Sequence, residues 1–128
     1  MRFHIDGTQP TEEDTVFVFG SNLAGVHGAG AARAALKFGA VMGAGIGLFG
    51  NTYAIPTKDK KIRTLSLPQI KVFVKEFVAF TKENPYKDFF VTRIGCVLAG
   101  YQDRDIAPLF KGCGPNCSFA KEWEIYLK

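Results

Sequence analysis

An apolar run that changes abruptly into glycines and then alanines occupies residues 15–35, TVFVFGSNLAGVHGAGAARAA. Residues 16–19, VFVF, are β-branched and aromatic without polar alternation, which is typical of a strand buried on both faces of a largely parallel sheet. The alanine-rich residues 31–36 favour a helix. This order of strand, glycine loop and helix predicts an α/β fold.

The loop between the strand and the helix contains Gly20, Gly25, Gly28 and Gly30. Glycine lets main-chain N–H groups approach a ligand closely, and a helix that starts after such a loop favours an anion. The loop is therefore a candidate phosphate site, with close packing of the strand on the helix as the alternative. It contains neither G-x-x-x-x-G-K-[ST] nor G-x-G-x-x-G, which argues against a P-loop nucleoside triphosphatase and an ordinary dinucleotide fold.

Length and composition predict one globular domain over residues 1–128, with 47% hydrophobic and 22% charged residues. Three cysteines indicate reduced thiols, residues 1–10 show no apolar signal region, and no stretch is long enough to span a bilayer. We therefore expect a cytoplasmic protein without a membrane partner. The net charge is +4 with scattered lysines, which keeps nucleic acid as a background alternative.

The rest of the chain alternates strand and helix patterns. Strands are expected at residues 2–5, 15–20, 52–55 and 88–94, with a turn at 6–10 and the first helix over 30–38. Pro56 is expected to limit the third strand, and the five glycines of residues 39–50 predict a loop or an active-site rim.

A long amphipathic helix is expected to run to about residue 83, because apolar residues recur at helical spacing after Ser66-Leu67-Pro68-Gln69. That tetrapeptide is a capping box with proline in the first turn. Another helix is expected to start near Asp103 or Asp105. In the tail, Ser118 is a candidate helix cap, and the tail is expected to pack onto the sheet.

A second small-residue loop, GCVLAGYQ, follows the strand expected at residues 88–94 and precedes a helix. Its position also suits an anion. Cys96 lies in this loop, where a small buried residue is a better interpretation than a nucleophile. Cys113 and Cys117 lack the second Cys or His pair of a tetrahedral zinc site.

The two loops resemble those of the macrodomain family, an ADP-ribose-binding module whose first loop typically reads N-A-A-N, then G-G-V-D-G-A. Residues 19–22, FGSN, lie on the first part, and residues 25–29, GVHGA, lie on the second, with His27 where many members have Asp. The second loop of the family commonly reads I-S-T-G-x-x-G-Y-P, and residues 94–102 align without a gap. Gly100 and Tyr101 match, whereas Val97 replaces a glycine.

Thr57-Lys58 resembles a dipeptide of the branch that contains terminal ADP-ribose glycohydrolases and antitoxins that remove ADP-ribose from DNA. In that branch the lysine is implicated at the anomeric carbon, and a partly desolvated lysine can act as a nucleophile. The alternative is that Lys58 only begins a solvated charged run, residues 58–61. Ala99 stands where the branch has its acidic residue. His27 is a second candidate general acid or base.

The resemblance implies a three-layer α/β/α domain with a mixed, largely parallel sheet. It implies that Asp6 contacts the adenine amino group, Asn22 the distal ribose, and Tyr101 covers a ribose. The diphosphate would be held by main-chain N–H groups of both loops, around Gly25, Val26, Gly28, Gly30, Gly95, Cys96, Val97, Leu98 and Gly100.

The expected ligand is ADP-ribose or a related adenine nucleotide, free or attached to a protein or nucleic acid. Hydrolysis of an ADP-ribosyl bond would use Lys58 or His27 and would require neither a metal nor a cofactor. Two alternatives remain: a non-enzymatic module that binds or sequesters the nucleotide, and a small nucleic-acid-binding protein.

Overall fold

A mostly parallel sheet organises the computed structural model, which describes residues 1–96 and 99–128. Within these residues the sheet has six strands in the order β1-β6-β5-β2-β4-β3. Every neighbouring pair is parallel except β3 and β4, which are antiparallel. The strands are β1 (Arg2–His4), β2 (Val16–Asn22), β3 (Gly47–Phe49), β4 (Thr52–Lys58), β5 (Phe89–Val91) and β6 (Cys117–Ala120). The predicted α/β class is confirmed.

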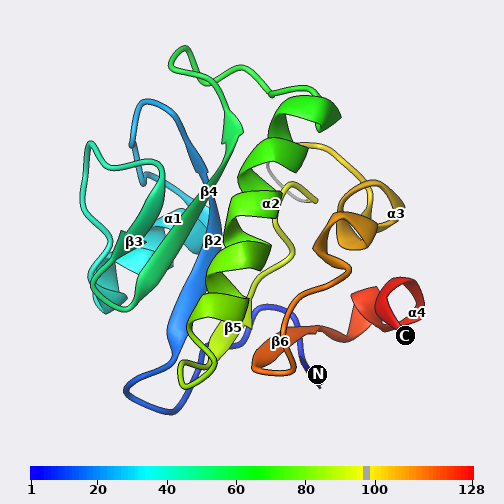
Figure 1. The fold of residues 1–128 in the computed structure, drawn as a ribbon. Coiled ribbons are helices and arrows are strands. Elements are labelled where there is room, and N and C mark those ends of the chain that lie inside the picture. The colour runs from blue at the N-terminus through cyan, green and yellow to red at the C-terminus, as the bar shows by residue number, and fades with distance from the viewer. Residues whose placement is uncertain (97–98) are drawn as a thin grey trace.

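Helices pack against both faces of this sheet (Figure 1). Alternate residues of β2 point to opposite faces, so Val16 and Val18 join the core beneath α2 (Leu67–Glu83), whereas Phe17 and Phe19 join the core beneath α1 (Gly30–Ala35). The described residues form two further helices, α3 (Asp103–Ile106) and α4 (Glu124–Leu127), and the 3-10 turns η1 (Leu36–Phe38), η2 (Ala107–Phe110) and η3 (Lys121–Trp123).

The helix α2 begins and ends where the sequence predicts. The side-chain oxygen Oε1 of Gln69 accepts hydrogen bonds from the N–H and from the hydroxyl of Ser66, each at 3.0 Å. At the other end the Asn84 side-chain amide donates to the Phe80 carbonyl at 2.9 Å. Both contacts satisfy polar groups that a helix leaves without partners inside itself. In the described part of the chain, no helix is both long and apolar enough to cross a membrane.

Two expectations about the middle of the chain are wrong. The glycine-rich residues 39–50 contain β3, which pairs with β4 from Gly47 opposite Ala54 to Phe49 opposite Thr52. In addition, Pro56 lies inside β4 and pairs in register with Ser21 of β2. Proline is tolerated there because the pairing of β3 with β4 stops at Ala54, so no strand of residues 1–96 and 99–128 pairs with the other edge of β4 at Pro56.

Three other boundaries differ from the sequence expectation. The central strand β2 extends beyond Gly20 to Asn22, and β5 is limited to Phe89–Val91 instead of residues 88–94. Ser118 is not a helix cap, because it lies in β6 between β1 and β5. The tail does pack onto the core as expected, since Trp123 is fully buried against Phe110 and Phe119.

Candidate functional site

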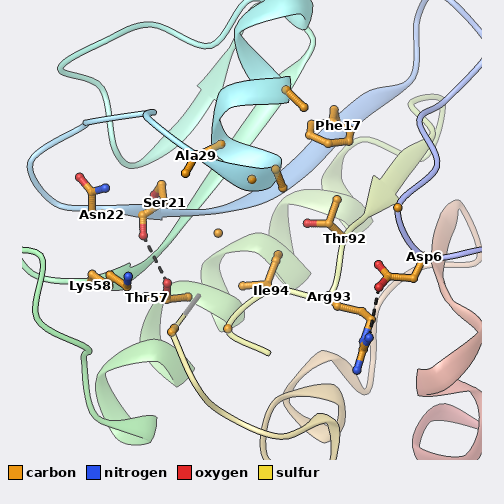
Figure 2. A pocket seen from close by; sticks show the side chains of 18 of the residues that line it. Asp6, Phe17, Ser21, Asn22, Ala29, Thr57, Lys58, Thr92, Arg93 and Ile94 are labelled. Atoms are coloured by element: carbon orange, nitrogen blue, oxygen red, sulfur yellow. Dashed lines mark hydrogen bonds and ion pairs between the residues drawn. The ribbon is translucent and has the colours of Figure 1, made fainter. Parts of the chain in front are cut away.

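A cavity of about 620 Å³ opens at the edge of the sheet where the parallel strands end (Figure 2). The chain leaves β2 for β4 on one side and later returns to β5 on the other, so the strand order reverses at β2. Open α/β sheets place their ligand sites at such a reversal, outside the carboxyl ends of the strands. Its volume is within the range of small-molecule sites.

The cavity brings together part of the predicted site. Seven predicted residues line it: Asp6, Asn22, Val26, Gly28, Gly30, Lys58 and Gly95. The described residues Gly25, His27, Cys96, Gly100 and Tyr101 do not line it. Val97 and Leu98 lie outside the described residues.

Asn22 closes the first loop with its own side chain. Its amide nitrogen donates to the Val26 carbonyl at 2.8 Å, and its amide oxygen accepts from the Val26 N–H at 3.0 Å. An asparagine amide has two hydrogens and its oxygen has two lone pairs, so each group keeps capacity for a ligand. Asn22 therefore both shapes the loop and faces the cavity.

Two glycines of this loop have different roles. A Cβ on Gly25, which has φ +70°, would lie 2.3 Å from the carbonyl carbon of Gly43, so this glycine is required for packing of two backbones. A Cβ on Gly28 would meet nothing closer than a Val26 methyl at 3.9 Å. Because Gly28 also lines the cavity, a larger side chain there would occupy ligand space.

His27 is turned away from the cavity and holds a neighbouring loop. Its ring is 2% exposed and packs edge-on against Phe19, with the centroids 5.3 Å apart. The nitrogen Nε2 lies 2.9 Å from the Val41 carbonyl oxygen and 3.2 Å from that of Ala44, so Nε2 carries the proton and donates. Unlike Lys58, His27 does not line the cavity, and its hydrogen bonds help to position residues 41–44.

Lys58 reaches the cavity from the last position of β4. The strand register shifts between Ser21 and Asn22, so Lys58 lies opposite Asn22. The Thr57 hydroxyl donates to the Ser21 carbonyl at 3.3 Å, and the Ser21 hydroxyl donates to Gly45. Lys58 is half-buried, and among the described residues no ion pair engages its ammonium, which leaves this group available to a ligand.

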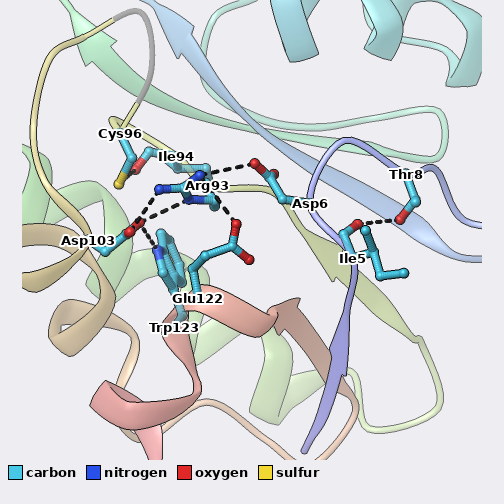
Figure 3. A network of polar contacts seen from close by, with 9 residues as sticks. All are labelled: Ile5, Asp6, Thr8, Arg93, Ile94, Cys96, Asp103, Glu122 and Trp123. Atoms are coloured by element: carbon cyan, nitrogen blue, oxygen red, sulfur yellow. Dashed lines mark hydrogen bonds and ion pairs between the residues drawn. The ribbon is translucent and has the colours of Figure 1, made fainter.

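An arginine that the sequence did not single out organises the other end of the cavity (Figure 3). Arg93 donates from Nε and Nη2 to both carboxylate oxygens of Asp103, at 3.0 and 2.7 Å. Its Nη1 lies 3.1 Å from Asp6 and 3.4 Å from Glu122. Trp123 also donates to Asp103 at 2.8 Å. The hydrogen bonds that Arg93 donates to Asp103, and after them the one it donates to Asp6, outweigh burial and raise the pKa of Arg93 above its ordinary value.

An aromatic wall stands beside these charges. The ring of His4 stacks on Phe90 with the centroids 3.7 Å apart, and Phe90 stacks in turn on Phe17. All three rings line the cavity, as do Ala31 and Ala34 of α1, which pack against the cluster that contains Phe17 and Phe90. Burial lowers the pKa of His4, although Asp6 opposes this shift, and its Nδ1 lies 2.7 Å from the Ser118 hydroxyl. This part of the cavity wall is therefore largely aromatic and apolar.

Residues of the second loop line two different cavities. Gly95 lines the cavity, whereas Cys96 and Tyr101 line a separate depression of about 340 Å³ beside Asp103. The Tyr101 hydroxyl donates to the Leu65 carbonyl. Burial, followed by the charge of Asp103, raises the pKa of Cys96 to about 12, so the group is a thiol at neutral pH. Such a group is a poor nucleophile.

Within residues 1–96 and 99–128, no cluster of His, Cys, Asp and Glu side chains has the makings of a metal site. The chain matches no protein-family model, no curated protein and no solved structure.

Proposed function

We propose that this protein binds ADP-ribose or a closely related adenine nucleotide in the cavity at the carboxyl ends of β2, β4 and β5, in the manner of the macrodomains that its loops resemble. The observation that carries the proposal is the convergence of Gly28, Gly95, Asp6, Asn22 and Lys58 on one cavity of about 620 Å³. These residues come from four separate segments of the chain, since Asn22 and Gly28 share the first loop, and the resemblance assigns each of them to the site from sequence alone. Helices on both faces of the sheet are compatible with the three-layer arrangement of that family.

The chemistry of the two ends suggests how the ligand would lie. The aromatic wall near Asp6 suits a base that carries an amino group, since a carboxylate accepts hydrogen bonds from such a group. The backbone around Gly28 and Gly95 would face the diphosphate. The second ribose would then reach Asn22 and Lys58, where an amide and an ammonium can hold its hydroxyls.

Titration with ADP-ribose and with AMP tests the proposal. ADP-ribose should bind in the micromolar range, about 8 kcal/mol, and more tightly than AMP, because AMP would leave the Lys58 end empty. Gly28→Val should abolish this binding without lowering the melting temperature, since its side chain would enter the cavity. In the matched variant, Gly25→Ala, the new Cβ meets backbone, so the melting temperature should fall. Equal affinity for both nucleotides, or none, would overturn the proposal.

Hydrolysis of an ADP-ribosyl bond is a second candidate function, and the unengaged Lys58 favours it. An ammonium beside the second ribose could stabilise the group that leaves the anomeric carbon, or its amine could attack that carbon. Release of ADP-ribose from carboxylate, serine and DNA linkages would distinguish this activity from binding alone. Binding to nucleic acid itself predicts a steep dependence on salt instead.

A further inference from the structure

A tight turn at the rim of the cavity holds one residue in an unfavourable backbone conformation. Ile62 has φ 63°, the one positive φ among the described residues other than glycine. The left-handed region is costly for a β-branched side chain, and such conformations persist where the surroundings determine them. Glycine or asparagine would adopt the same turn with less strain. The choice of isoleucine therefore needs a reason outside the turn itself.

Asp59 supplies the contacts that fix the turn. Its Oδ1 accepts hydrogen bonds from the N–H groups of Lys61 and Arg63, at 2.8 and 2.9 Å. Its own N–H donates to the Arg63 carbonyl at 2.8 Å, and its Oδ2 pairs with the Arg63 guanidinium at 3.1 Å. With the residues on both sides held in this way, the backbone at Ile62 has little freedom to relax.

The base of the turn is continuous with the cavity wall. A bridge joins Lys58 to Thr64, and the Leu65 N–H donates to the Thr57 carbonyl at 2.8 Å. The Thr64 hydroxyl donates to the carbonyl of Ala99, which lines the cavity, at 3.2 Å. The turn is thus tied to β4, which carries Lys58, and to the second loop.

The side chain of Ile62 does not serve the protein core. It is 45% exposed, belongs to neither core cluster, and lines the cavity. An apolar side chain held at a cavity rim can lose its exposure by packing on a ligand. The carbon-bound hydrogens of a sugar ring offer such a surface, and Lys58 and Asn22 supply the polar contacts beside it.

We propose that Ile62 is a specificity-determining residue, which the turn of residues 59–63 presents to the ligand group bound beside Lys58. This inference rests on the proposed function, under which that group is the second ribose of ADP-ribose. Ile62 then favours a ligand with a second sugar over a mononucleotide, because the mononucleotide does not reach the rim. Asp59 is a positioning residue that acts through Ile62.

Calorimetric titration of Ile62→Gly and Ile62→Asn with ADP-ribose and AMP tests this inference. Both replacements tolerate a positive φ, so the turn should survive and the melting temperature should not fall. The affinity for ADP-ribose should drop about tenfold, or about 1.4 kcal/mol, whereas the affinity for AMP should stay unchanged. The control is Val72→Ala, which removes an exposed apolar side chain from α2, away from the cavity.

Asp59→Ala should reduce ADP-ribose affinity in the same selective way, and the double variant with Ile62→Gly should lose little more, because both changes act on one contact. An unchanged preference for ADP-ribose in Ile62→Gly would overturn this inference and leave the proposed function intact. Equal loss of both ligands would also overturn it. If the wild-type protein binds ADP-ribose no better than AMP, the proposed function fails and the inference fails with it.

Discussion

The two ends of the cavity use their charged groups in opposite ways (Figure 2). At one end the Arg93 guanidinium lies among three carboxylates, those of Asp6, Asp103 and Glu122. At the other end the Lys58 ammonium has no charged partner among the described residues. The charged groups at the Arg93 end are paired with one another, whereas the Lys58 ammonium is unpaired in the described part of the chain.

This difference indicates what each end can do. A guanidinium whose hydrogen bonds go to carboxylates holds those carboxylates in place, and the excess of negative charge around Arg93 disfavours phosphate. Ionic contacts there fix the shape of the cavity. The ammonium of Lys58 is available to attract or protonate oxygen atoms of a ligand. We therefore expect the Arg93 end to stabilise the fold and the Lys58 end to contact the ligand, and each expectation can be tested separately.

The largest expected effect is on turnover at the Lys58 end. If the protein hydrolyses ADP-ribosyl bonds, Lys58→Ala should reduce the rate by about a hundredfold or more, the usual contribution of a positioned acid or base. ADP-ribose affinity should change little, because most contacts with the base and phosphates remain. The measurements are single-turnover release of ADP-ribose and calorimetric titration.

Lys60→Ala is the matched control, because Lys60 is an exposed lysine near Lys58 and does not line the cavity. His27→Ala should act mainly through the position of residues 41–44, so it should lower the melting temperature. Full activity in Lys58→Ala would remove Lys58 from the chemistry. A wild-type protein that binds ADP-ribose but releases none from any linkage would favour the non-enzymatic module.

The two ends of the cavity also differ in how well they could be predicted from the sequence alone. Most of the Lys58 end could be predicted, because its residues lie in short local motifs: Asn22 ends a buried strand, Gly28 follows it, and Thr57-Lys58 ends another. Helix α2 was predicted for the same reason, since Ser66, Gln69 and the helical spacing are local signals. Local patterns therefore identified the central strands and the loops at their ends.

The Arg93 end was largely missed, because its partners lie far apart in the sequence. Arg93 and Asp6 are 87 positions apart, and no spacing rule relates an arginine at the end of one strand to an aspartate after another. Tyr101 matched a motif but turned toward Leu65. Whether a loop side chain faces the cavity or the core depends on tertiary packing, which one sequence does not reveal.

Arg93→Met tests the structural role of the paired end and should have the next largest effect. Removing the guanidinium leaves Asp6 and Asp103 without their main cationic partner, which should lower the free energy of unfolding by about 2 kcal/mol. Urea denaturation measures this change. The control, Arg2→Met, breaks an exposed pair with Asp88 and should cost less than about 1 kcal/mol. Equal effects of the two variants would show that the network adds no more than a surface ion pair.

The smallest expected effect is the dependence of stability on pH at Asp103. Burial raises the pKa of Asp103, but hydrogen bonds from Arg93, Trp123 and Cys96 outweigh burial, so the net pKa lies below its ordinary value of 3.8. The folded protein therefore binds this proton less tightly than the unfolded chain does. The resulting stability is complete above the ordinary pKa and is lost as the pH falls through the lowered pKa of the folded state.

The free energy of unfolding should therefore fall as the pH is lowered from about 5 to below 3.8, and Asp103 should account for part of the loss. Asp103→Asn should reduce this pH dependence, because the amide has no proton to gain in that range. Asp14→Asn, which removes an exposed carboxylate, should leave the dependence as it is. Urea denaturation at both pH values measures the slope for each variant. The same slope in wild type and Asp103→Asn would mean that the charge of Asp103 does not stabilise the fold. The ion pairs of the Arg93 end would then no longer set it apart from the Lys58 end as the part that stabilises the fold.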